Sequence, residues 1–569
     1  MVQDKTAAPV SGRSAAGDPV TGPAPGSPKG PPIGPEDGPP GAGAPLPGSR
    51  LALPARVAGA AAGGLLLFLA FPPLGLWFLA PLGMASAVLA VRGTRPRRGT
   101  WLGLLVGLAL LLPGLRWVSP IGTDAWLGLV AMESAFYAAW GTGVALVTRL
   151  RLWPLWGAAL WVAVEWARGV FPFGGFPWAR VAFSQGESLF TPYAALGGAP
   201  LVSFAVALCG GLLALAVSRL LAPALPSSGS RRGRALALPL AGALAVPAAA
   251  LAVPRYGDEG RNVTVGVIQG NVPGRGMHPL GDEPAVVLGN HTRMLHQMAR
   301  DVREGRTPRP DLVVLPENST DIDPLRNAFA RSEIDAAVKD VGVPVLVGAV
   351  VGIGENNRAT RSIVWDPVTG PGAHYDKQKL VPFGEFTPLQ GLVQALFERA
   401  SLVGKQSVAG TRDGDLRLGP VTVGAINCYE VAFDGVVGDT ARTGATPLVV
   451  QTNNATYALT NLPPQQLAMS QLRAVEHNRA VITSAITGIS AYVTPSGSIA
   501  WRTGELVPAM NVLTVPVRTA RTIATRVGAL PEWALILVGA GAVAAAWRRR
   551  TPRAEHPVNR EDDQQVGDA

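Results

Sequence analysis

The segment Tyr375-Asp-Lys-Gln-Lys-Leu-Val-Pro-Phe-Gly-Glu385 places a lysine and a glutamate on either side of a Pro-Phe-Gly turn. Two more segments of the same polar region, Leu312-Val-Val-Leu-Pro-Glu317 and Gly424-Ala-Ile-Asn-Cys-Tyr-Glu430, add a carboxylate and a thiol. In both, the reactive side chain follows a short apolar run typical of a buried strand. Because α/β folds place their chemistry at strand ends, we expect Glu317, Lys377 and Cys428 to share one site of an α/β domain.

These segments lie in a polar insert between apolar runs. Of the 569 residues, 48% are hydrophobic and 15% are charged, and the charges gather in the middle and at the ends of the chain. Eight apolar runs approach the ~20 residues that a helix needs to cross a bilayer. We therefore expect a multi-pass α-helical membrane domain of about seven spans at 51–255 and one more span at 529–548. The runs are residues 55–71, 74–91, 100–118, 125–148, 153–170, 195–222, 234–253 and 530–546. The first two runs are separated by Pro72-Pro73, and the alternative to two spans is that they form one kinked or re-entrant hairpin.

Basic residues predict the orientation of the spans. Arginines cluster after the second, fourth, sixth and last runs. Because positively charged loops stay in the cytoplasm, both termini are expected there and the insert is expected to be extracytoplasmic. The net charge of +10 reflects these clusters rather than one basic stripe with aromatic residues, so we exclude a nucleic-acid partner. Residues 1–50, rich in Pro and Gly, and residues 549–569 are expected to be disordered cytoplasmic tails.

The insert at 256–520 has the rhythm of an α/β domain, because short β-type runs alternate with longer polar or amphipathic stretches. Of the two cysteines, Cys209 lies in an apolar run and Cys428 lies in the insert. A disulfide between them is therefore not expected, and Cys428 is free to act as a nucleophile. The β-type runs are residues 263–269, 312–315, 343–350, 421–426, 447–452 and 480–486.

Together, these residues suit acyl transfer through a cysteine thioester. A thiol reacts as the thiolate, and its ordinary pKa is about 8.5. Glu317 is suited to be the general base, and Lys377 is suited to lower the thiol pKa and to stabilise an oxyanion. The backbone N–H of Tyr429 is a second candidate oxyanion donor. Glu385 is placed to hold the lysine, and Glu430 to orient the site. The alternative for Cys428 alone is inert packing, the usual role of a lone buried cysteine.

The reactive segments resemble the Glu–Lys–Cys motifs of the nitrilase superfamily. The longer pattern Tyr375-x-Lys-x-x-Leu-Val-Pro-Phe-Gly-Glu-Phe-x-Pro388 is similar to the bacterial apolipoprotein N-acyltransferase family. So are Glu165-Trp-x-Arg-Gly169 and Gly175-Phe-Pro-Trp178 in the apolar half, and the Gln466–Arg479 segment of the insert. The resemblance covers roughly residues 55–550. It implies an extracytoplasmic α-β-β-α sandwich joined to the membrane domain.

The resemblance also implies a reaction. In that family, the catalytic triad falls on Glu317, Lys377 and Cys428, with Glu385 and Glu430 in support. The expected activity moves a fatty acyl chain from a membrane phospholipid to the cysteine. The chain then passes to the free N-terminal amine of a diacylglyceryl-modified lipoprotein. The expected partners are these two lipids and the bilayer of a bacterial cell membrane. No metal or soluble cofactor is implied.

One segment departs from the family pattern. After Gln451-Thr, relatives often read Asn-Asp-x-Trp-Phe, whereas this chain reads Asn453-Asn-Ala-Thr-Tyr457. A charge and an indole are therefore missing near the expected substrate position, which bears on substrate selectivity.

A candidate substrate arm follows the Pro-Phe-Gly turn. Leu389, Leu392 and Phe397 have helical spacing on one apolar face. Two alternatives stay open for them, an arm that dips into the bilayer and an ordinary packed helix.

Three ionisable residues fall in or near the predicted spans. Such groups are functional candidates by default. Glu165 and Arg168 are three residues apart on a predicted helix, so we expect them to pair with each other. Glu133 has no partner predicted from its spacing.

Two other functions remain open at this point. A membrane-anchored nitrilase-type amidase would use water as the second acceptor. A non-catalytic scaffold for a polyprenol-phosphate mannosyltransferase would not need Cys428.

Overall fold

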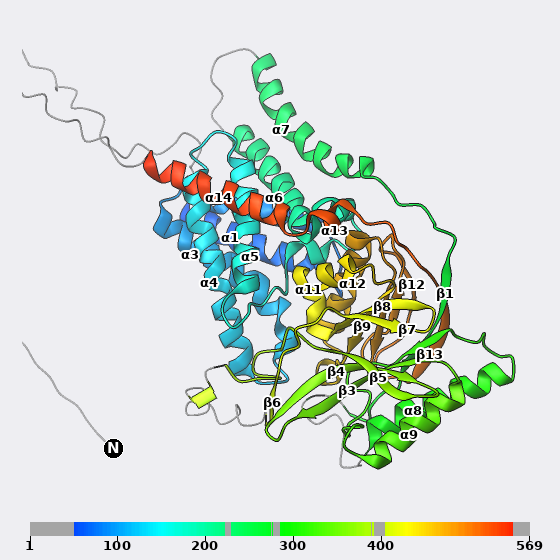
Figure 1. The fold of residues 1–569 in the computed structure, drawn as a ribbon. Coiled ribbons are helices and arrows are strands. Elements are labelled where there is room, and N and C mark those ends of the chain that lie inside the picture. Colours follow the sequence, from blue (N-terminus) through cyan, green and yellow to red (C-terminus); the bar gives the residue numbers. More distant parts are fainter. Residues whose placement is uncertain are drawn as a thin grey trace, which may run out of the picture. The chain divides into compact units, whose positions relative to one another are not determined.

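The computed structural model describes residues 51–221, 229–274, 276, 285–388, 390–391 and 404–549. The predicted tails, apart from residue 549, and the predicted arm residues Leu389, Leu392 and Phe397 lie outside the described residues. The described chain forms a group of mostly apolar helices and two β-sheets that carry their own helices (Figure 1).

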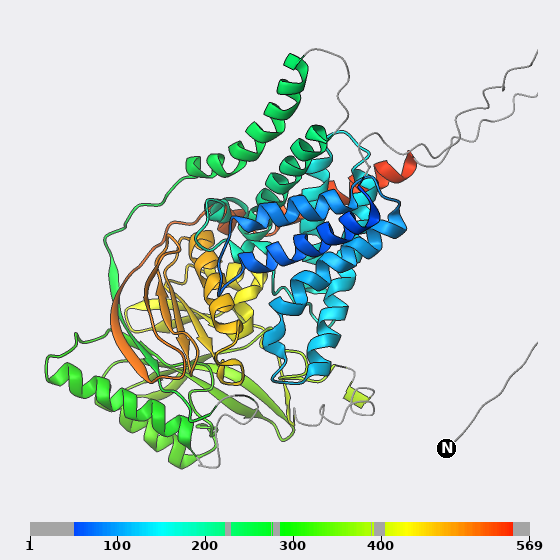
Figure 2. The same cartoon turned by 180° about the vertical axis from the view of Figure 1, so that it is seen from behind.

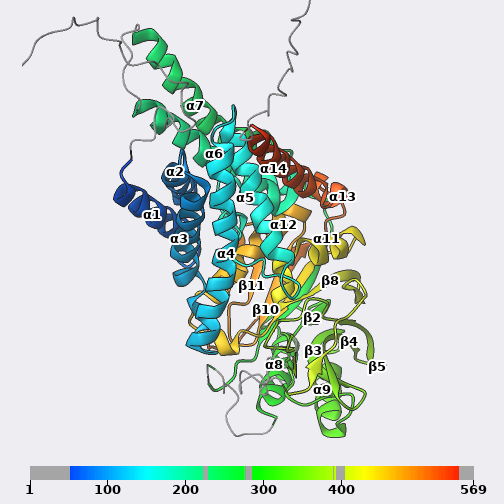
Figure 3. The ribbon, with the colours of Figure 1, turned by 90° about the vertical axis from the view of Figure 1, so that its left-hand side faces the viewer.

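Eight helices coincide with the eight apolar runs, and α1 to α6 lie side by side (Figure 3). Among the described residues, five helical segments are long and apolar enough to cross a membrane. They are α1 (Leu53–Ala70), α4 (Thr123–Val147), Thr191–Leu220 with α6 (Ala194–Leu220), Gly233–Ala252 with most of α7 (Gly229–Ala249), and α14 (Leu530–Arg548). The other three do not meet that test: α2 (Leu79–Val91) has 13 residues, α3 (Pro96–Gly114) begins with two arginines, and α5 (Trp153–Val170) carries Glu165 and Arg168.

Glycines set the distance between α3 and α4. A Cβ on Gly103 would lie 2.2 Å from the carbonyl oxygen of Tyr137, and one on Gly141 would lie 2.2 Å from that of Gly99. Only glycine fits at contacts this close. Small residues of this kind let two backbones pack tightly where lipid removes the hydrophobic driving force between helices.

Two sheets form the polar half. The first has the order β13-β1-β2-β3-β4-β5, with β6 beside β4, and the second has the order β12-β11-β10-β9-β8-β7. At their centres, β1, β2 and β3 run parallel, as do β8, β9 and β10. The strands are β1 (Asn262–Gln269), β2 (Leu312–Val314), β3 (Val345–Ile353), β4 (Asn357–Asp366), β5 (Gly370–Asp376), β6 (Gln406–Ser407), β7 (Asp415–Leu418), β8 (Val421–Asn427), β9 (Leu448–Thr452), β10 (Val481–Ala485), β11 (Ala491–Val493), β12 (Ile499–Arg502) and β13 (Ala509–Pro516).

The sheets face each other and carry helices on their outer faces. Val265 and Leu346 of the first sheet share a buried cluster with Val423 and Ile482 of the second. The helices α8 (Val286–Arg303) and α9 (Ala328–Val341) pack on the first sheet (Figure 2). The helices α11 (Asp434–Arg442) and α12 (Leu462–His477) pack on the second sheet. The expected α-β-β-α sandwich is therefore present.

The α11–α12 layer also packs against the apolar helices. One continuous cluster of buried side chains contains Leu472 of α12, Val450 of β9 and Val206 of α6. The second sheet is thus covered by α11 and α12, whose other side contacts the apolar helices. We call this contact region the seam, and the strand ends of the second sheet lie close to it.

Ion pairs reinforce the seam. Arg180, in the loop before α6, contacts Asp434 Oδ2 of α11 at 2.6 Å. Arg473 of α12 contacts Asp434 Oδ1 at 2.7 Å and Glu476 at 2.5 Å. Both arginine side chains are buried, and Asp434 is the carboxylate that contacts both of them. Arg180 also lies 3.4 Å from Glu532. Although burial raises the pKa of Asp434, the charges of Arg180 and Arg473 outweigh it and lower that pKa to about 2.

Replacing Asp434 with Asn should lower the free energy of unfolding by about 3 kcal/mol, because it removes the carboxylate that pairs with both buried arginines. A carboxyl with a lowered pKa stabilises the fold above its ordinary value near 3.9. That stability is lost as the pH falls toward 2. The measurement is thermal unfolding of the detergent-purified chain between pH 7 and pH 3. The matched control is Asp439→Asn in the same helix, whose partner Arg442 is more exposed. Equal melting temperatures for the two variants at pH 7 would contradict the prediction.

Candidate active site

A buried lysine joins two carboxylates at the centre of the candidate site. Lys377 Nζ donates to Glu317 Oε1 at 3.0 Å and to Glu385 Oε1 at 2.9 Å. Lys377 and Glu317 are only 2% and 4% exposed. Glu385 is fixed in turn, because its Oε2 accepts the Val381 N–H at 2.7 Å. The structure therefore brings together three of the residues predicted from sequence.

Strand ends place Glu317 and Lys377. Glu317 follows β2. The backbone just before it passes so close to β3 that a Cβ on Gly348 would lie 2.2 Å from the Pro316 carbonyl oxygen. Lys377 directly follows β5, and its N–H donates to the Thr360 carbonyl at 2.9 Å. A glycine at 348 is thus required for Glu317 to reach the lysine.

Cys428 occupies a strained turn. It directly follows β8 and begins a short 3-10 helix, Cys428–Ala432, with a φ of +50°. Such a left-handed conformation is unfavourable for a residue with a Cβ and is frequent at functional sites. The thiol is within hydrogen-bond reach of Thr452 Oγ1 at 3.1 Å and Gln466 Nε2 at 3.6 Å. The residue is partly accessible, whereas Cys209 is buried.

Glu430 ties the cysteine turn to the lysine loop. Its carboxylate accepts the Asn427 N–H at 2.7 Å and the Gln378 N–H at 2.6 Å. It also accepts the Tyr375 hydroxyl at 2.9 Å and the Lys379 N–H at 3.1 Å. Burial raises the pKa of Glu430 to about 7, although these donors oppose the shift. The position matches the orienting role expected for Glu430.

Tyr429 anchors the cysteine turn to the apolar half. Its hydroxyl donates to the Gly175 carbonyl at 2.9 Å. Its ring stacks on Phe176 and Trp178, with centroids 6.0 and 6.3 Å away. The side chain adjoining the thiol is therefore held by the loop that follows α5. The sequence motif indicates only a role for the backbone N–H of Tyr429 and gives no sign of this side-chain contact.

The charges around the thiol keep it protonated at rest. Burial and the negative charge of Glu317 raise the pKa of Cys428 to about 12, against the opposing charge of Lys377. Burial also raises the pKa of Glu317, while Lys377 opposes the rise. Although burial lowers the pKa of Lys377, the carboxylates of Glu317 and Glu385 outweigh it and raise that pKa. Lys377 thus acts in the expected direction on the thiol, but it does not lower the thiol pKa below the ordinary value.

A polar cluster next to the thiol was not found from the sequence. Thr452 is the last residue of β9, and the next residue, Asn453, donates its N–H to Glu317 Oε2 at 2.9 Å. The segment that departs from the family pattern adds Asn454, whose Nδ2 donates to Gln466 Oε1 at 2.9 Å. Gln466 therefore touches both Asn454 and Cys428. Its place in the quoted Gln466–Arg479 pattern was the only signal in the sequence.

The expected Glu165–Arg168 pair is wrong. Arg168 Nε instead contacts Glu133 Oε2 of α4 at 2.7 Å. Glu165 Oε1 accepts the Trp161 indole N–H at 2.8 Å and the Val181 N–H at 2.7 Å. Spacing along α5 cannot reveal a partner on a neighbouring helix. All three side chains are buried, which fits a structural role.

Comparisons with known proteins agree with this architecture. Residues 63–212 match the family model "Apolipoprotein N-acyltransferase N-terminal domain", and residues 284–527 match "Carbon-nitrogen hydrolase". The chain is 38% identical over 507 residues to an apolipoprotein N-acyltransferase of Mycolicibacterium smegmatis, an alignment that covers 85% of this chain and 84% of the relative. It is 26% identical over 504 residues to the apolipoprotein N-acyltransferase of Shewanella oneidensis, covering 83% and 92% of the two chains. The solved structure of an amidase from Nesterenkonia sp. aligns with 47% of this chain and 93% of its own, at 18% identity and a TM-score of 0.33.

Replacing Glu317 with Gln should make the Cys428 thiol more acidic, because it removes the negative charge that raises the thiol pKa and leaves Lys377 in place. Below the pKa, each unit of decrease raises the thiolate fraction about tenfold. Alkylation of Cys428 by iodoacetamide at pH 8 should therefore accelerate by about tenfold or more. The measurement is peptide mass spectrometry in a Cys209→Ser background.

The control is Glu355→Gln, at an exposed turn between β3 and β4, which should leave the rate unchanged. Slower alkylation of Glu317→Gln would mean that Glu317 already holds the thiol proton at rest, which contradicts the charge balance described above.

Proposed function

Because the chain belongs to the apolipoprotein N-acyltransferase family, we propose that it acylates lipoproteins through a thioester on Cys428. The observation that carries this proposal is the Lys377 ammonium between two carboxylates, beside a thiol whose turn is bound to the apolar helices. A base, an electrophilic cation and a nucleophile are the groups that two-step acyl transfer requires.

In the first half-reaction, the substrate carbonyl is the ester of a membrane phospholipid. Glu317 takes the thiol proton as sulfur attacks the carbonyl carbon. A raised carboxyl pKa suits this base, because it brings the proton affinities of acid and thiol closer together. The new C–S bond leaves negative charge on the carbonyl oxygen, which Lys377 stabilises together with backbone N–H groups. When the tetrahedral intermediate collapses, the ester C–O bond breaks, and Glu317 returns its proton to the departing lysophospholipid oxygen.

In the second half-reaction, the free N-terminal amine of a diacylglyceryl-modified lipoprotein attacks the thioester. The C–N bond forms, Glu317 takes a proton from the amine, and the C–S bond breaks. The sulfur leaves as thiolate and regains its proton from Glu317. Lys377 stabilises the second oxyanion as it did the first. The cycle restores the resting thiol and uses no outside proton donor.

Lys377 should be needed in both steps for its ammonium group. Replacing it with Met removes an oxyanion donor, which typically costs 10²–10³-fold in rate. The matched control is Lys379→Met, two residues along, whose ammonium lies over the Phe433 ring at 5.4 Å. The assay follows, by mass spectrometry, acyl transfer from phospholipid to a diacylglyceryl-cysteine peptide.

The same assay separates the acyltransferase from a membrane-anchored amidase. A peptide with a free amine should gain one acyl chain, and an N-acetylated peptide should gain none. Release of free fatty acid without any acylated peptide would support the amidase instead. Absence of acyl transfer and of fatty acid release by the wild type as well as by Cys428→Ala would leave only a role that does not depend on the thiol, such as the scaffold.

We also propose that the chain is a multi-pass protein of the bacterial cell membrane, with cytoplasmic termini and an extracytoplasmic sandwich. The five helices long and apolar enough to cross a membrane support the membrane location. The eight apolar runs, seven before the sandwich and one after it, support the orientation together with the arginine clusters. Alkaline phosphatase, which is active only outside the cytoplasm, should be active when fused after residue 520 and inactive when fused after residue 569. The reverse pattern would contradict this topology.

A further inference from the structure

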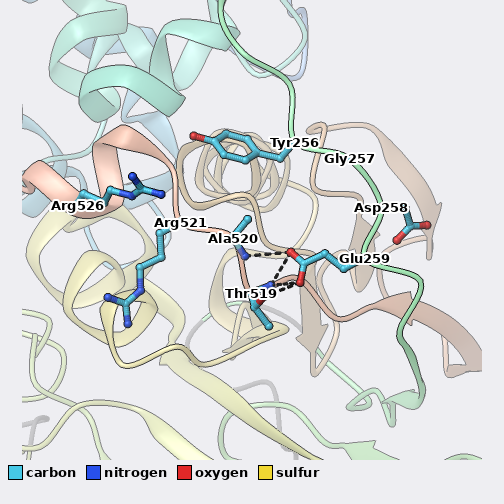
Figure 4. A pocket seen from close by; sticks show the side chains of 8 residues that line it. All are labelled: Tyr256, Gly257, Asp258, Glu259, Thr519, Ala520, Arg521 and Arg526. Atoms are coloured by element: carbon cyan, nitrogen blue, oxygen red, sulfur yellow. Dashed lines mark hydrogen bonds between the residues drawn. The ribbon is translucent and has the colours of Figure 1, made fainter.

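A pocket opens between the two linkers that join the sandwich to candidate spans. One linker follows Gly233–Ala252, and the other precedes α14 (Figure 4). The pocket has a volume of about 540 Å³ and contains none of the candidate catalytic residues. It is lined by Tyr256, Gly257, Asp258, Glu259, Thr519, Ala520, Arg521 and Arg526.

The acidic side chains of this pocket already have partners. Glu259 accepts the Thr519 N–H at 2.8 Å, the Thr519 hydroxyl at 2.5 Å and the Ala520 N–H at 2.9 Å. Asp258 lies 3.8 Å from Arg518, which is outside the pocket lining. Figure 4 shows both carboxylates on the side of the pocket away from Arg526. The negative charge is therefore confined to one wall.

The opposite wall is cationic. Arg521 and Arg526, the latter in the short helix α13 (Ile523–Val527), are both exposed. Arg521 donates one hydrogen bond, to the Arg442 carbonyl at 2.7 Å, and so keeps further N–H donors. Within the part of the chain that the structure describes, Arg526 has no ion-pair or hydrogen-bond partner for its guanidinium. The Tyr256 ring lies on the same side of the pocket as Arg526 (Figure 4).

Apolar side chains surround this wall. Leu251, before the first linker, is 64% exposed, and Leu530, at the start of α14, is 69% exposed. Ile523 is also exposed, three residues from Arg526 on α13. Leu251 and Leu530 each belong to a candidate span, so the pocket lies at the ends of two spans. A tyrosine beside exposed apolar residues is typical of the boundary between lipid and water. Arginine side chains near the ends of spans reach toward the same boundary.

We propose that this pocket binds the phosphate of an anionic phospholipid, such as phosphatidylglycerol, through Arg521 and Arg526, with Tyr256 beside the headgroup. A guanidinium pairs with a phosphate through two parallel N–H donors. A lipid is favoured over free phosphate because its acyl chains would cover the exposed apolar residues. The proposal rests on the membrane placement given above, and it concerns a lipid that is held rather than consumed.

The test is native mass spectrometry of the full chain in neutral detergent. Short-chain phosphatidylglycerol, short-chain phosphatidylcholine and inorganic phosphate are titrated separately. The wild type should bind phosphatidylglycerol most tightly. The double variant Arg521→Gln/Arg526→Gln should bind it roughly thirtyfold more weakly, the loss expected for two basic residues at an anionic lipid surface. The control, Arg293→Gln/Arg502→Gln, removes two exposed arginines of the sandwich and should bind like the wild type.

Three results would overturn the proposal. They are equal phosphatidylglycerol binding by the wild type and the double variant, equal binding of the two lipids by the wild type, and displacement of the lipid by equimolar inorganic phosphate. Acylation of Cys428 is measured on the same samples and should be unchanged in the double variant. If even the wild type formed no acyl adduct, the proposed chemistry would fail, while the lipid titrations would still decide whether this site exists.

Discussion

The rest of the site depends on the burial of one ammonium group between two carboxylates. Lys377 has almost no access to water, so its charge is tolerable only because Glu317 and Glu385 both accept from it. The three charged groups come from different parts of the sandwich. Glu317 follows the end of β2, Lys377 follows the end of β5, and Glu385 lies in the turn after it. The pair of carboxylates therefore fixes how these three segments meet, and it leaves one excess negative charge beside the thiol.

Burial and that excess charge together explain why the Cys428 thiol can be inert at rest. A thiolate formed without substrate would lie in a buried site beside Glu317, and both effects raise its pKa. Charge develops favourably only when it moves onto a carbonyl oxygen that Lys377 can reach. A site of this kind would acylate itself when a lipid ester is in place and resist modification otherwise. The binding of Tyr429 to the loop after α5 holds this nucleophile against the helices where lipid is expected.

The sequence predicted the components of the site well, because Glu317, Lys377 and Cys428 each follow a strand end and strand ends converge in α/β folds. Glu317, Lys377, Glu385, Glu430 and Cys428 are brought together as expected, and their chemical roles stay predictions. The partners that escaped prediction are those set by tertiary packing. Arg168 pairs with Glu133 on another helix, and Asp434 bridges two arginines across the seam. Thr452 and Gln466 reach the thiol from β9 and α12. The raised thiol pKa also escaped prediction, because it depends on burial that no local pattern reveals.

An acyl group carried by Cys428 would be visible in the intact mass of the protein. Purified wild type and Cys428→Ala are incubated with phospholipid alone and weighed. The thioester mechanism requires one added acyl mass on the wild type, none on the variant, and removal of that mass by neutral hydroxylamine, which cleaves thioesters. An unmodified wild type that still acylates a lipopeptide would contradict it, because transfer would then proceed without the thioester.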